Sequence, residues 1–373
     1  MTKSAIVVGA GIVGLATAKA LAEKGFTVTV VERTQKAVGA SIRNFGMIWP
    51  IGQPDGTLYE TAKLSRRIWK QVCSEANIWH DEVGSLHTAY EADEYRVLEE
   101  LAATYTHRGY KLVTPDATRE LSPATAEKNL KGGLYSPEEM IVDPRKAIAA
   151  IPGWLQEKYK VNFLWGKAVT KVAHPAVHAG DEVFYADLIY VCSGADFETL
   201  YPDMYAALPI TKCKLQMMRL QAQPDNWRIG PALCGALSLA HYQAFKAASS
   251  LSTLMTRFES QYPDYLKHGI HVMVSQNQAG ELTVGDSHEY GLNPDPFDRS
   301  VINKLILDYL DSFATFKQPA IIETWNGIYP KLTNGEANIV LHPESGVTVI
   351  NGLGGAGMTL SFGFCDQLIK NSI

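Results

Sequence analysis

The sequence lacks a long hydrophobic run, a large net charge and any closely spaced pair of cysteines. Because no apolar stretch is long enough to cross a bilayer, we expect no membrane span. The net charge of −5 gives no electrostatic reason to expect a nucleic-acid partner. The five cysteines are scattered, which suggests reduced thiols and no metal site. Since Met1 leads almost directly into an apolar strand, we expect no signal peptide and a cytoplasmic protein.

The composition is that of an ordinary soluble protein. Apolar residues make up 46% of the chain and charged residues 20%. A chain of 373 residues exceeds what one hydrophobic core usually serves, so two domains are expected. The strongest functional signals are two glycine-rich stretches that lie far apart in the sequence.

The first of these stretches, residues 4–33, has the order strand, glycine turn, helix, strand. Residues 5–8 form a short apolar run rich in β-branched side chains, which predicts a buried strand. A helix is predicted over residues 12–24, with Gly25 as its C-cap, and a second strand over residues 27–31. This order is typical of the βαβ unit that binds a dinucleotide.

Three glycines in this unit follow the spacing G-x-G-x-x-G. Gly9 permits a tight turn, Gly11 lets the backbone approach a pyrophosphate, and Gly14 lets the helix pack close to the strand. The amides at the helix N-terminus supply partial positive charge for the diphosphate. Glu32 ends the second strand, where a carboxylate can accept hydrogen bonds from an adenosine ribose. This unit alone does not decide between NAD and FAD.

The second glycine-rich stretch, residues 347–370, favours FAD. A strand runs into Gly354, Gly355 and Gly357, and a helix is predicted to begin near Met358. An NAD enzyme has no need of a second such turn. A flavin enzyme uses one, because reduced flavin carries negative charge around N1 and the C2 carbonyl, which a helix N-terminus stabilises. The plain alternative is a tight strand-to-helix turn without a ligand.

The rest of the chain alternates between helical and extended segments. Helices are predicted over residues 58–79, 93–108, 144–159, 250–267 and 299–316. Asp143 and Pro144 mark the start of the third, as an N-cap and a first-turn proline. The alternating strands of residues 213–283 predict an antiparallel sheet, unlike the parallel pattern of the first unit. Another strand, residues 188–192, runs into a small-residue turn that could also approach the cofactor.

These motifs resemble those of the FAD-dependent amine and amino-acid oxidoreductases, a family that includes D-amino-acid oxidase, glycine oxidase and monomeric sarcosine oxidase. The resemblance covers nearly the whole chain. It implies an α/β fold: a Rossmann-like, glutathione-reductase-like FAD-binding domain and an α+β substrate domain with an antiparallel sheet. The FAD-binding domain is expected over residues 1–85, 141–212 and 320–373, and the substrate domain over residues 86–140 and 213–319.

The resemblance also implies which residues contact FAD. Sarcosine oxidases place a flavin-linking cysteine near the position of Gly327; this chain has none there, so we expect non-covalent FAD. The expected contacts lie in the two glycine turns, at the end of the second strand, in the loop that follows it and in two later segments. They are Gly9, Gly11, Ile12, Val13, Gly14, Glu32, Arg33, Ala40, Ser41, Asn44, Phe45, Gly46, Val169, Ser193, Gly194, Gly354, Gly355, Gly357, Met358 and Thr359.

The chain departs from this family at the substrate clamp. Tyr329 stands where many α-amino-acid oxidases have an arginine before a proline, so the usual two-pronged carboxylate clamp is missing. The runs SIRNFGMIWPIGQP, HYQAF, GDSHEYG and GLGGAGMTL look most like a subgroup that accompanies aminophosphonate breakdown. A phosphonate is a bulkier dianion than a carboxylate, which would account for the missing clamp. Arg43, Lys331 and the histidines are then candidates to receive it, although Arg43 could equally bind an FAD phosphate.

Four further candidates for the substrate site each have an ordinary structural alternative. Tyr329 could orient an amine or anion, or be a half-buried strand tyrosine. His271 begins a strand that lines the cavity in the relatives, yet it could simply pack in the core. His288 follows a strand end and could face a ligand or lie in an exposed loop. Tyr242, beside His241, is placed in the cavity by resemblance alone.

The sequence therefore predicts FAD-dependent oxidation of a small amine at its C–N bond. Hydride transfer to flavin N5 would give an imine that hydrolyses to an aldehyde or ketone. The favoured substrates are 2-aminoethylphosphonate or its N-methyl form, and the alternatives are glycine, sarcosine or a D-amino acid. Two competing functions are an FAD-dependent 2-hydroxy-acid dehydrogenase and a non-catalytic FAD-binding subunit. No acid–base residue is assigned, and the electron acceptor is oxygen or another compound.

Overall fold

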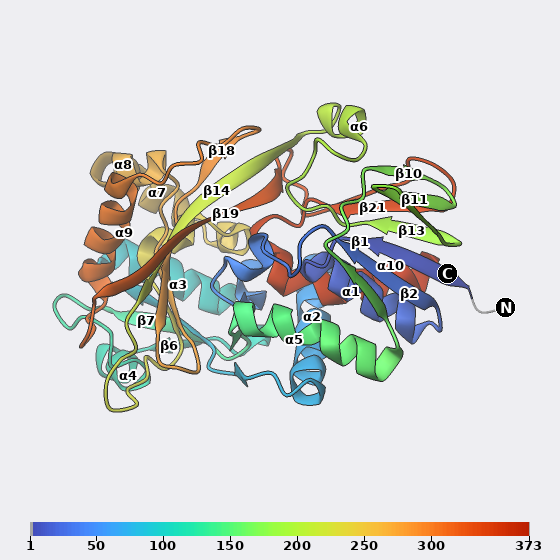
Figure 1. The fold of residues 1–373 in the computed structure, drawn as a ribbon. Helices are drawn as coiled ribbons and strands as arrows, with labels where there is room; N and C mark the ends of the chain where they lie inside the picture. The colour runs from blue at the N-terminus through green and yellow to red at the C-terminus, as the bar shows by residue number, and fades with distance from the viewer. Residues whose placement is uncertain (1–2, 373) are drawn as a thin grey trace.

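The computed structural model describes residues 3–372, and two large β-sheets occupy opposite sides of the molecule (Figure 1). Two long paired strands, β14 (Ile210–Leu220) and β19 (Ile321–Leu332), run between the regions of the two sheets. Within the described residues, no helix has the length and apolar character needed to cross a membrane. All five cysteines are buried, and none forms a disulfide.

The first sheet has six strands and is almost entirely parallel. In spatial order they are β20 (Ile339–Leu341), β21 (Val347–Asn351), β13 (Leu188–Val191), β1 (Ser4–Val8), β2 (Thr27–Glu32) and β9 (Asn162–Trp165). Only the β20–β21 pair is antiparallel. The chain leaves β1 for β2 on one side, while β13 and β21 are added on the other. The strand order thus reverses at the carboxyl end of β1, where sheets of this kind bind their ligands.

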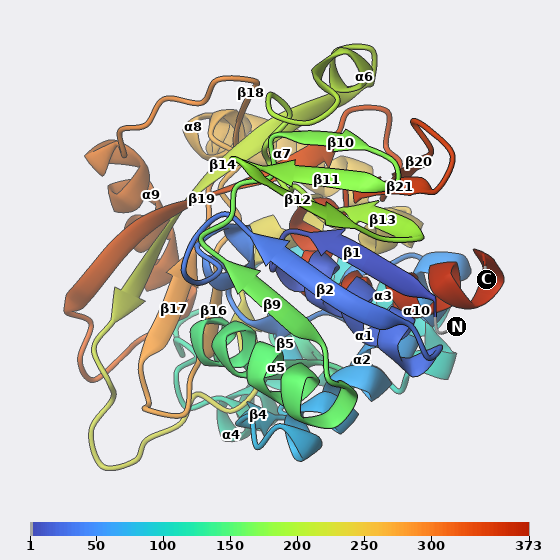
Figure 2. The same ribbon diagram turned by 45° about the vertical axis from the view of Figure 1, so that its right-hand side comes forward.

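Both faces of this sheet are covered. The helices on one side are α1 (Ile12–Glu23), α2 (Thr57–Glu75), α5 (Pro144–Tyr159) and α10 (Gly357–Ser372). A small sheet of β10 (Lys171–Ala173), β11 (Ala176–Ala179) and β12 (Glu182–Tyr185) lies on the other side (Figure 2). Successive side chains of β1 point to opposite faces: Val7 packs against the helices and Ile6 packs under the small sheet.

The second sheet has nine strands and forms the other wall of the site. In spatial order they are β18 (Glu289–Gly291), β14, β17 (Leu282–Gly285), β16 (Met273–Gln276), β15 (Ala232–Cys234), β5 (Ser85–Ala89), β7 (Gly132–Ser136) and β6 (Lys111–Val113), and β19 also pairs with β14. Every pair is antiparallel except β15–β5. The antiparallel sheet predicted for the middle of the chain is confirmed.

Shorter elements surround the second sheet and connect the two. The helices are α3 (Ala92–Thr104), α4 (Pro115–Leu121), α6 (Pro202–Ala206), α7 (Leu251–Gln261), α8 (Pro263–Lys267) and α9 (Ser300–Phe313). A fourth sheet consists of β3 (Met47–Ile48), β8 (Met140–Val142) and β4 (His80–Asp81). The 3-10 turns are η1 (Ala40–Ile42), η2 (Pro50–Gly52), η3 (Thr106–Arg108), η4 (Ala236–Ala240), η5 (Gln243–Ala247) and η6 (Gly354–Ala356).

The predicted helices are present; the one predicted over 144–159 has these bounds, while those predicted to end at 79, 108 and 316 end earlier, at Glu75, Thr104 and Phe313. The predicted segment 250–267 is two helices, because Pro263 cannot continue the first and begins the second. The N-cap prediction is confirmed: the Asp143 side chain accepts hydrogen bonds from the N–H groups of Arg145 and Lys146. The residue boundaries proposed for the two domains stay a prediction.

Candidate active site

The turn between β1 and α1 brings backbone close to Gly9 and Gly14. Gly9 has a φ of +103°, which L side chains rarely adopt, and a Cβ there would lie 2.5 Å from the carbonyl oxygen of Cys192. A Cβ on Gly14 would lie 1.9 Å from the carbonyl oxygen of Gly9. Gly11 differs, because a Cβ there would meet only Oγ of Ser41, at 3.1 Å, and Gly11 lines a large cavity. Its open side leaves room for a pyrophosphate at the helix N-terminus.

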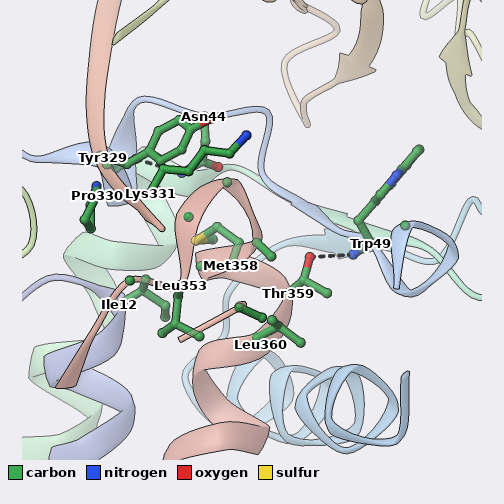
Figure 3. Close-up of a pocket in the computed structure, with 18 of the residues that line it drawn as sticks. Ile12, Asn44, Trp49, Tyr329, Pro330, Lys331, Leu353, Met358, Thr359 and Leu360 are labelled. Atoms are coloured by element: carbon green, nitrogen blue, oxygen red, sulfur yellow. Dashed lines mark hydrogen bonds between the residues drawn. The ribbon is translucent and has the colours of Figure 1, made fainter. Parts of the chain in front are cut away.

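The helix of the second glycine stretch begins beside α1. A Cβ on Gly357, the first residue of α10, would lie 3.9 Å from Cγ2 of Ile12, the first residue of α1 (Figure 3). Neither helix has an acidic residue in its first turn. The partial positive charges of two helix N-termini therefore face the same cavity without a neutralising carboxylate. This arrangement suits a ligand with two separate anionic groups, such as a diphosphate and a reduced flavin.

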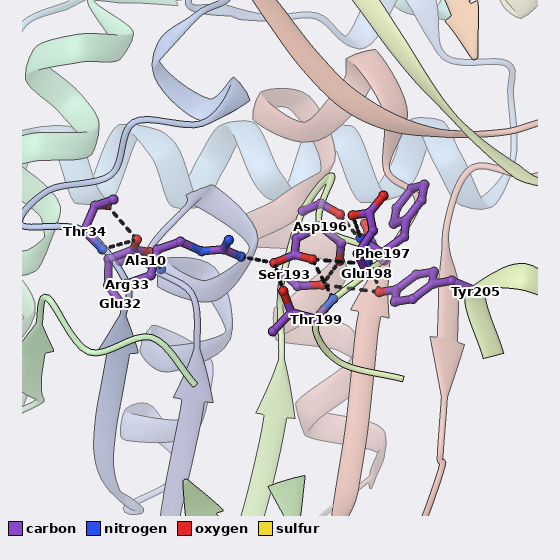
Figure 4. A network of polar contacts seen from close by, with 12 residues as sticks. Ala10, Glu32, Arg33, Thr34, Ser193, Asp196, Phe197, Glu198, Thr199 and Tyr205 are labelled. Atoms are coloured by element: carbon purple, nitrogen blue, oxygen red, sulfur yellow. Dashed lines mark hydrogen bonds and ion pairs between the residues drawn. The ribbon is translucent and has the colours of Figure 1, made fainter. Parts of the chain in front are cut away.

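Polar contacts join the carboxyl ends of β1, β2 and β13 beside this turn (Figure 4). Oε2 of Glu32 accepts a hydrogen bond from the N–H of Ala10 at 2.8 Å, and Oε1 accepts one from Oγ1 of Thr34 at 2.8 Å. Arg33 forms an ion pair with Asp196, across the end of β1. The carboxylate of Glu32 is thus fixed at the end of β2, the position from which such a residue reaches an adenosine ribose.

The loop after β2 returns to the N-terminus of α1. Oγ of Ser41 accepts a hydrogen bond from the N–H of Ile12 at 2.9 Å. Asn44 closes the loop on itself: Nδ2 donates to the carbonyl oxygens of Ala40 and Ser41, and Oδ1 accepts from the N–H of Gly46 at 2.8 Å. A serine and an asparagine in this loop therefore have a structural reason to be there, besides any contact with a cofactor.

A cavity of about 510 Å³ extends from the glycine turns to the second sheet. The FAD-contact candidates in its wall are Gly11, Ile12, Val13, Ala40, Ser41, Asn44, Phe45, Gly194, Gly354, Gly355, Gly357, Met358 and Thr359. The substrate-site candidates in its wall are Tyr329, His271, His288, Tyr242, Arg43 and Lys331. The FAD-contact candidates outside that wall are Gly9, Gly14, Glu32, Arg33, Gly46, Val169 and Ser193. The cavity thus brings together all the substrate-site candidates and most of the FAD-contact candidates.

The cavity suits FAD in its chemistry. The open side of Gly11 and the N-terminus of α1 would hold the diphosphate, and the N-terminus of α10 would face the flavin ring. Phe45, Met217 and Met273 supply apolar surface on the wall that a planar ring system can pack against. Bound FAD would supply the redox chemistry, because no side chain in this wall can accept a hydride.

Strand register sets a row of polar groups opposite the glycine turns. Cys213 of β14 pairs with Tyr329 of β19 on one side and with Tyr290 of β18 on the other. Tyr329 is buried, and its Oη lies 3.2 Å from Nε2 of His288. Lys331 donates a hydrogen bond of 3.1 Å to the hydroxyl of Tyr290, whose side chain is exposed. The row thus has a buried, uncharged part at Tyr329 and a cationic part near solvent.

A buried carboxyl and two further imidazoles stand behind His288. Two backbone hydrogen bonds hold His271 opposite Asp286, just beyond the paired ends of β16 and β17. Nδ1 of His271 lies 3.2 Å from Oδ1 of Asp286, and the ring of His241 stacks on that of His271 with centroids 3.8 Å apart. Burial lowers the pKa of His271 to about 4 and raises the pKa of Asp286 well above its usual range. At neutral pH this cluster is therefore uncharged.

The three histidines present nitrogen atoms within 4.8 Å of one another, a grouping that could hold a metal ion and that the sequence did not predict. Ring geometry argues against metal binding. A metal ion lies near the plane of each imidazole that binds it, about 2.0–2.1 Å from the nitrogen. The rings of His241 and His271 are stacked with 7° between their planes, so no point within bonding distance of both rings lies near both planes. They could bind one ion only after a ring turns out of the stack.

Sequence reasoning misplaced one of these residues and missed others. The predicted strand 271–276 begins at Met273 in the structure, so His271 lies in the connection before β16. Asp286 and Met217 line the cavity but were not predicted. Asp286 is one of two acids in the run GDSHEYG, and only the pairing of β16 with β17 places it opposite His271. Met217 lies in a strand whose apolar residues gave no sign of which face borders the cavity.

The parallel sheet, the two helix N-termini and the cavity that they share with the second sheet are features of an FAD-dependent oxidoreductase. Residues 4–370 match the family described as DAO, FAD-dependent oxidoreductase. The chain belongs to this DAO family. The predicted fold class, the enzyme class and FAD as the cofactor are confirmed.

Individual relatives are distant. The chain is 29% identical to the tRNA 5-methylaminomethyl-2-thiouridine biosynthesis bifunctional protein MnmC of Pseudomonas aeruginosa over 250 residues, which is 62% of this chain and 35% of that protein. The chain therefore spans about a third of the length of this curated relative. Glycine oxidase from Bacillus cereus has a similar structure, with a TM-score of 0.78 and 16% identity, covering 100% of this chain and 96% of that one.

L-α-glycerophosphate oxidase from Mycoplasma pneumoniae, solved with FAD bound, is also similar in structure. Its TM-score is 0.72 at 18% identity, covering 100% of this chain and 96% of that one. At these identities the two structural likenesses establish the fold and leave the substrate open.

Proposed function

We propose that this protein oxidises a small amine that carries an anionic group, at its C–N bond, with FAD as the hydride acceptor. The charge of the cavity wall is the observation that carries this proposal. Its cationic side chains are Arg43, Lys246 and Lys331. Its acids are Asp286, which burial keeps protonated, and Glu336, which is exposed. A wall with a net positive charge attracts an anionic substrate.

Within this class we favour 2-aminoethylphosphonate or its N-methyl form, followed by sarcosine and glycine. Tyr329, which replaces the family's clamping arginine, offers no two-pronged site for a carboxylate. Lys331 is a point charge near solvent, hydrogen-bonded to Tyr290, and an ammonium of this kind suits a tetrahedral dianion without imposing a planar geometry. Oxidation of the carbon beside the nitrogen would give an imine, and water would convert that imine to an aldehyde.

The names of the relatives support oxidation at a C–N bond, and one of them also suggests an alternative reaction. The bifunctional Pseudomonas protein is named for a methylaminomethyl group, which contains a secondary amine, and the Bacillus enzyme is named for glycine. L-α-glycerophosphate oxidase is named for an alcohol that carries a phosphate. Oxidation of a C–O bond, as in a 2-hydroxy-acid dehydrogenase, is therefore the second candidate.

An anaerobic titration of the purified yellow protein tests the proposal. We expect 2-aminoethylphosphonate or its N-methyl form to bleach the visible flavin absorbance, with sarcosine and glycine less effective. Bleaching by 2-hydroxy acids alone would contradict amine oxidation, and flavin that no small substrate bleaches would indicate a non-catalytic subunit. Admitting air after bleaching then separates oxygen from other electron acceptors, because rapid return of the colour requires reaction with oxygen.

A further inference from the structure

Tyr329, His288 and Asp286 form a row of polar side chains that begins beside the turn before α10. A Cβ on Gly355, in the turn before α10, would lie 3.5 Å from Oη of Tyr329. That Oη lies 3.2 Å from Nε2 of His288, which lies 3.8 Å from Oδ2 of Asp286. The other oxygen of Asp286 lies 3.2 Å from Nδ1 of His271. All four of these polar side chains belong to residues that are at most 7% exposed.

The phenol of Tyr329 and Nε2 of His288 can pair with the phenol as the donor and the imidazole as the acceptor. Burial raises the pKa of Tyr329 well above its usual value, so the phenol keeps its proton. Burial lowers the pKa of His288 well below its usual value, so its ring is neutral and Nε2 can accept. Besides the weakly donating thiol of Cys213, the Tyr329 oxygen can accept from a donor in the cavity, and an amine N–H is such a donor.

We propose that Tyr329 and His288 form a proton relay that neutralises the substrate's ammonium group before oxidation. The proposal rests on the proposed function, because the relay needs an amine substrate. An ammonium N–H bond breaks as its proton passes to Oη of Tyr329, while the phenol proton passes to Nε2 of His288. Tyr329 ends unchanged, the amine is neutral, and His288 carries the proton beside Asp286. No electrons are transferred, and the amine gains the lone pair that oxidation of its neighbouring carbon requires.

Burial does not prevent this transfer, because it penalises the ammonium and the imidazolium alike. The protonated Asp286 carboxyl lies close to the ring of His288 and supplies a polar neighbour without charge. The anionic group of the substrate supplies a favourable charge, whereas Lys331 opposes the transfer. The titratable groups that face the relay are Lys331 of β19, Cys213 of β14, Asp286 after β17, Tyr290 of β18, His271 before β16, and His241 and Tyr242 after η4.

Anaerobic stopped-flow reduction of the FAD-loaded enzyme by 2-aminoethylphosphonate tests the relay. Tyr329→Phe removes the phenol oxygen, and His288→Gln keeps an acceptor for the phenol but cannot take up a proton. Near pH 7 the substrate arrives as an ammonium, and each variant should reduce FAD about 10²-fold more slowly than the wild type. The ratio of the wild-type rate to the variant rate should fall at least about tenfold near pH 10, because much of the amine is already neutral there.

A matched control is Tyr242→Phe, which removes a hydroxyl that contacts Sδ of Met273 in the same cavity but lies outside the relay. Any loss of rate in this variant should be the same at all pH values. If amines reduce FAD but Tyr329→Phe and His288→Gln show a deficit that does not change with pH, the relay is wrong and amine oxidation stands. If 2-hydroxy acids reduce FAD and no amine does, the proposed function and the relay both fail.

Discussion

The backbone N–H of Trp49 donates a hydrogen bond to Oγ1 of Thr359, 2.9 Å away, and both groups are buried (Figure 3). One hydroxyl thus ties the residue after β3 to the first turn of α10, and both segments line the cavity. Thr359→Ala would leave that N–H buried without a partner, which costs about 1–3 kcal/mol. We expect a lower melting temperature and less FAD retained on purification. Thr359→Ser keeps the hydroxyl and should behave like the wild type. A Thr359→Ala variant with the melting temperature and FAD content of the wild type would contradict this role.

Gly11→Val should abolish the binding of FAD. Its branched side chain would occupy the open side of the turn, where we place the diphosphate, and its Cβ would already lie 3.1 Å from Oγ of Ser41. The measurement is the ratio of visible to near-ultraviolet absorbance of the purified protein. Gly153→Ala is the matched control, because a Cβ at that α5 position meets no atom within 4 Å. A Gly11→Val variant of normal yellow colour would rule out the phosphate role of this glycine.

Acid precipitation should release the flavin into the supernatant. We predict non-covalent FAD, because no cysteine lines the cavity except Cys192, which packs beneath the glycine turn. Burial also raises the pKa of that thiol, which disfavours the reactive thiolate. Absorbance near the flavin maximum in the pellet after washing would show a covalent bond and overturn the prediction.

The stability of the protein should depend on the ionisation of Glu139. This side chain is fully buried, accepts hydrogen bonds from the N–H of Ile51 and from Oγ of Ser85, and burial raises its pKa to about 7. The folded chain therefore binds a proton that the unfolded chain releases, so the free energy of unfolding falls as pH rises from about 5 to about 7. The loss is at most about 3 kcal/mol.

Glu139→Gln is the test of this pH dependence, because glutamine keeps acceptor oxygen and size without titrating. Melting temperatures of both proteins, saturated with FAD, should be measured across that pH range. The wild type should lose stability relative to Glu139→Gln as pH rises. Parallel curves would show that Glu139 does not titrate there.

Lys331→Met should weaken the binding of the anionic part of the substrate. Removing one charged hydrogen bond of about 1.5–3 kcal/mol predicts a KM about 10–100-fold higher for an aminophosphonate. A neutral amine of similar length should show little change in KM, because it has no anion to lose. Lys304→Met, which removes a surface lysine paired with Asp308, is the matched control. Equal effects on the charged and the neutral amine would argue against an anion site at Lys331.

The cofactor side of the site could be predicted from the sequence, whereas the substrate side could be predicted only in outline. Gly9, Gly14 and Glu32 act within one continuous βαβ unit, so their spacing alone reports the turn, the close packing and the strand end. That α1 and α10 would lie side by side followed from the two glycine-rich stretches, each of which can be recognised from its local sequence. Their common cavity was then expected from the flavin chemistry that each helix N-terminus favours.

The polar cluster on the other wall depends on contacts between segments that are far apart in the chain. His271 stands opposite Asp286 because β16 pairs with β17, and Tyr329 reaches His288 because β19 and β18 lie on either side of β14. Strand register fixes these neighbours, and a shift by one residue would turn each side chain to the opposite face. The sequence contained the residues but not the register, so it proposed His288 and Tyr329 separately and passed over Asp286.

The order of the segments around FAD has a consequence for how the protein is made. α1 follows the first strand of the described chain, whereas its partner α10 is the last element, so most of the described chain separates them. A nascent polypeptide cannot complete the proposed flavin pocket until the exit tunnel has released the first turn of α10, residues 357–360. The yellow colour of a preparation therefore reports that synthesis ran through to that point, and chains stopped short of it should emerge colourless.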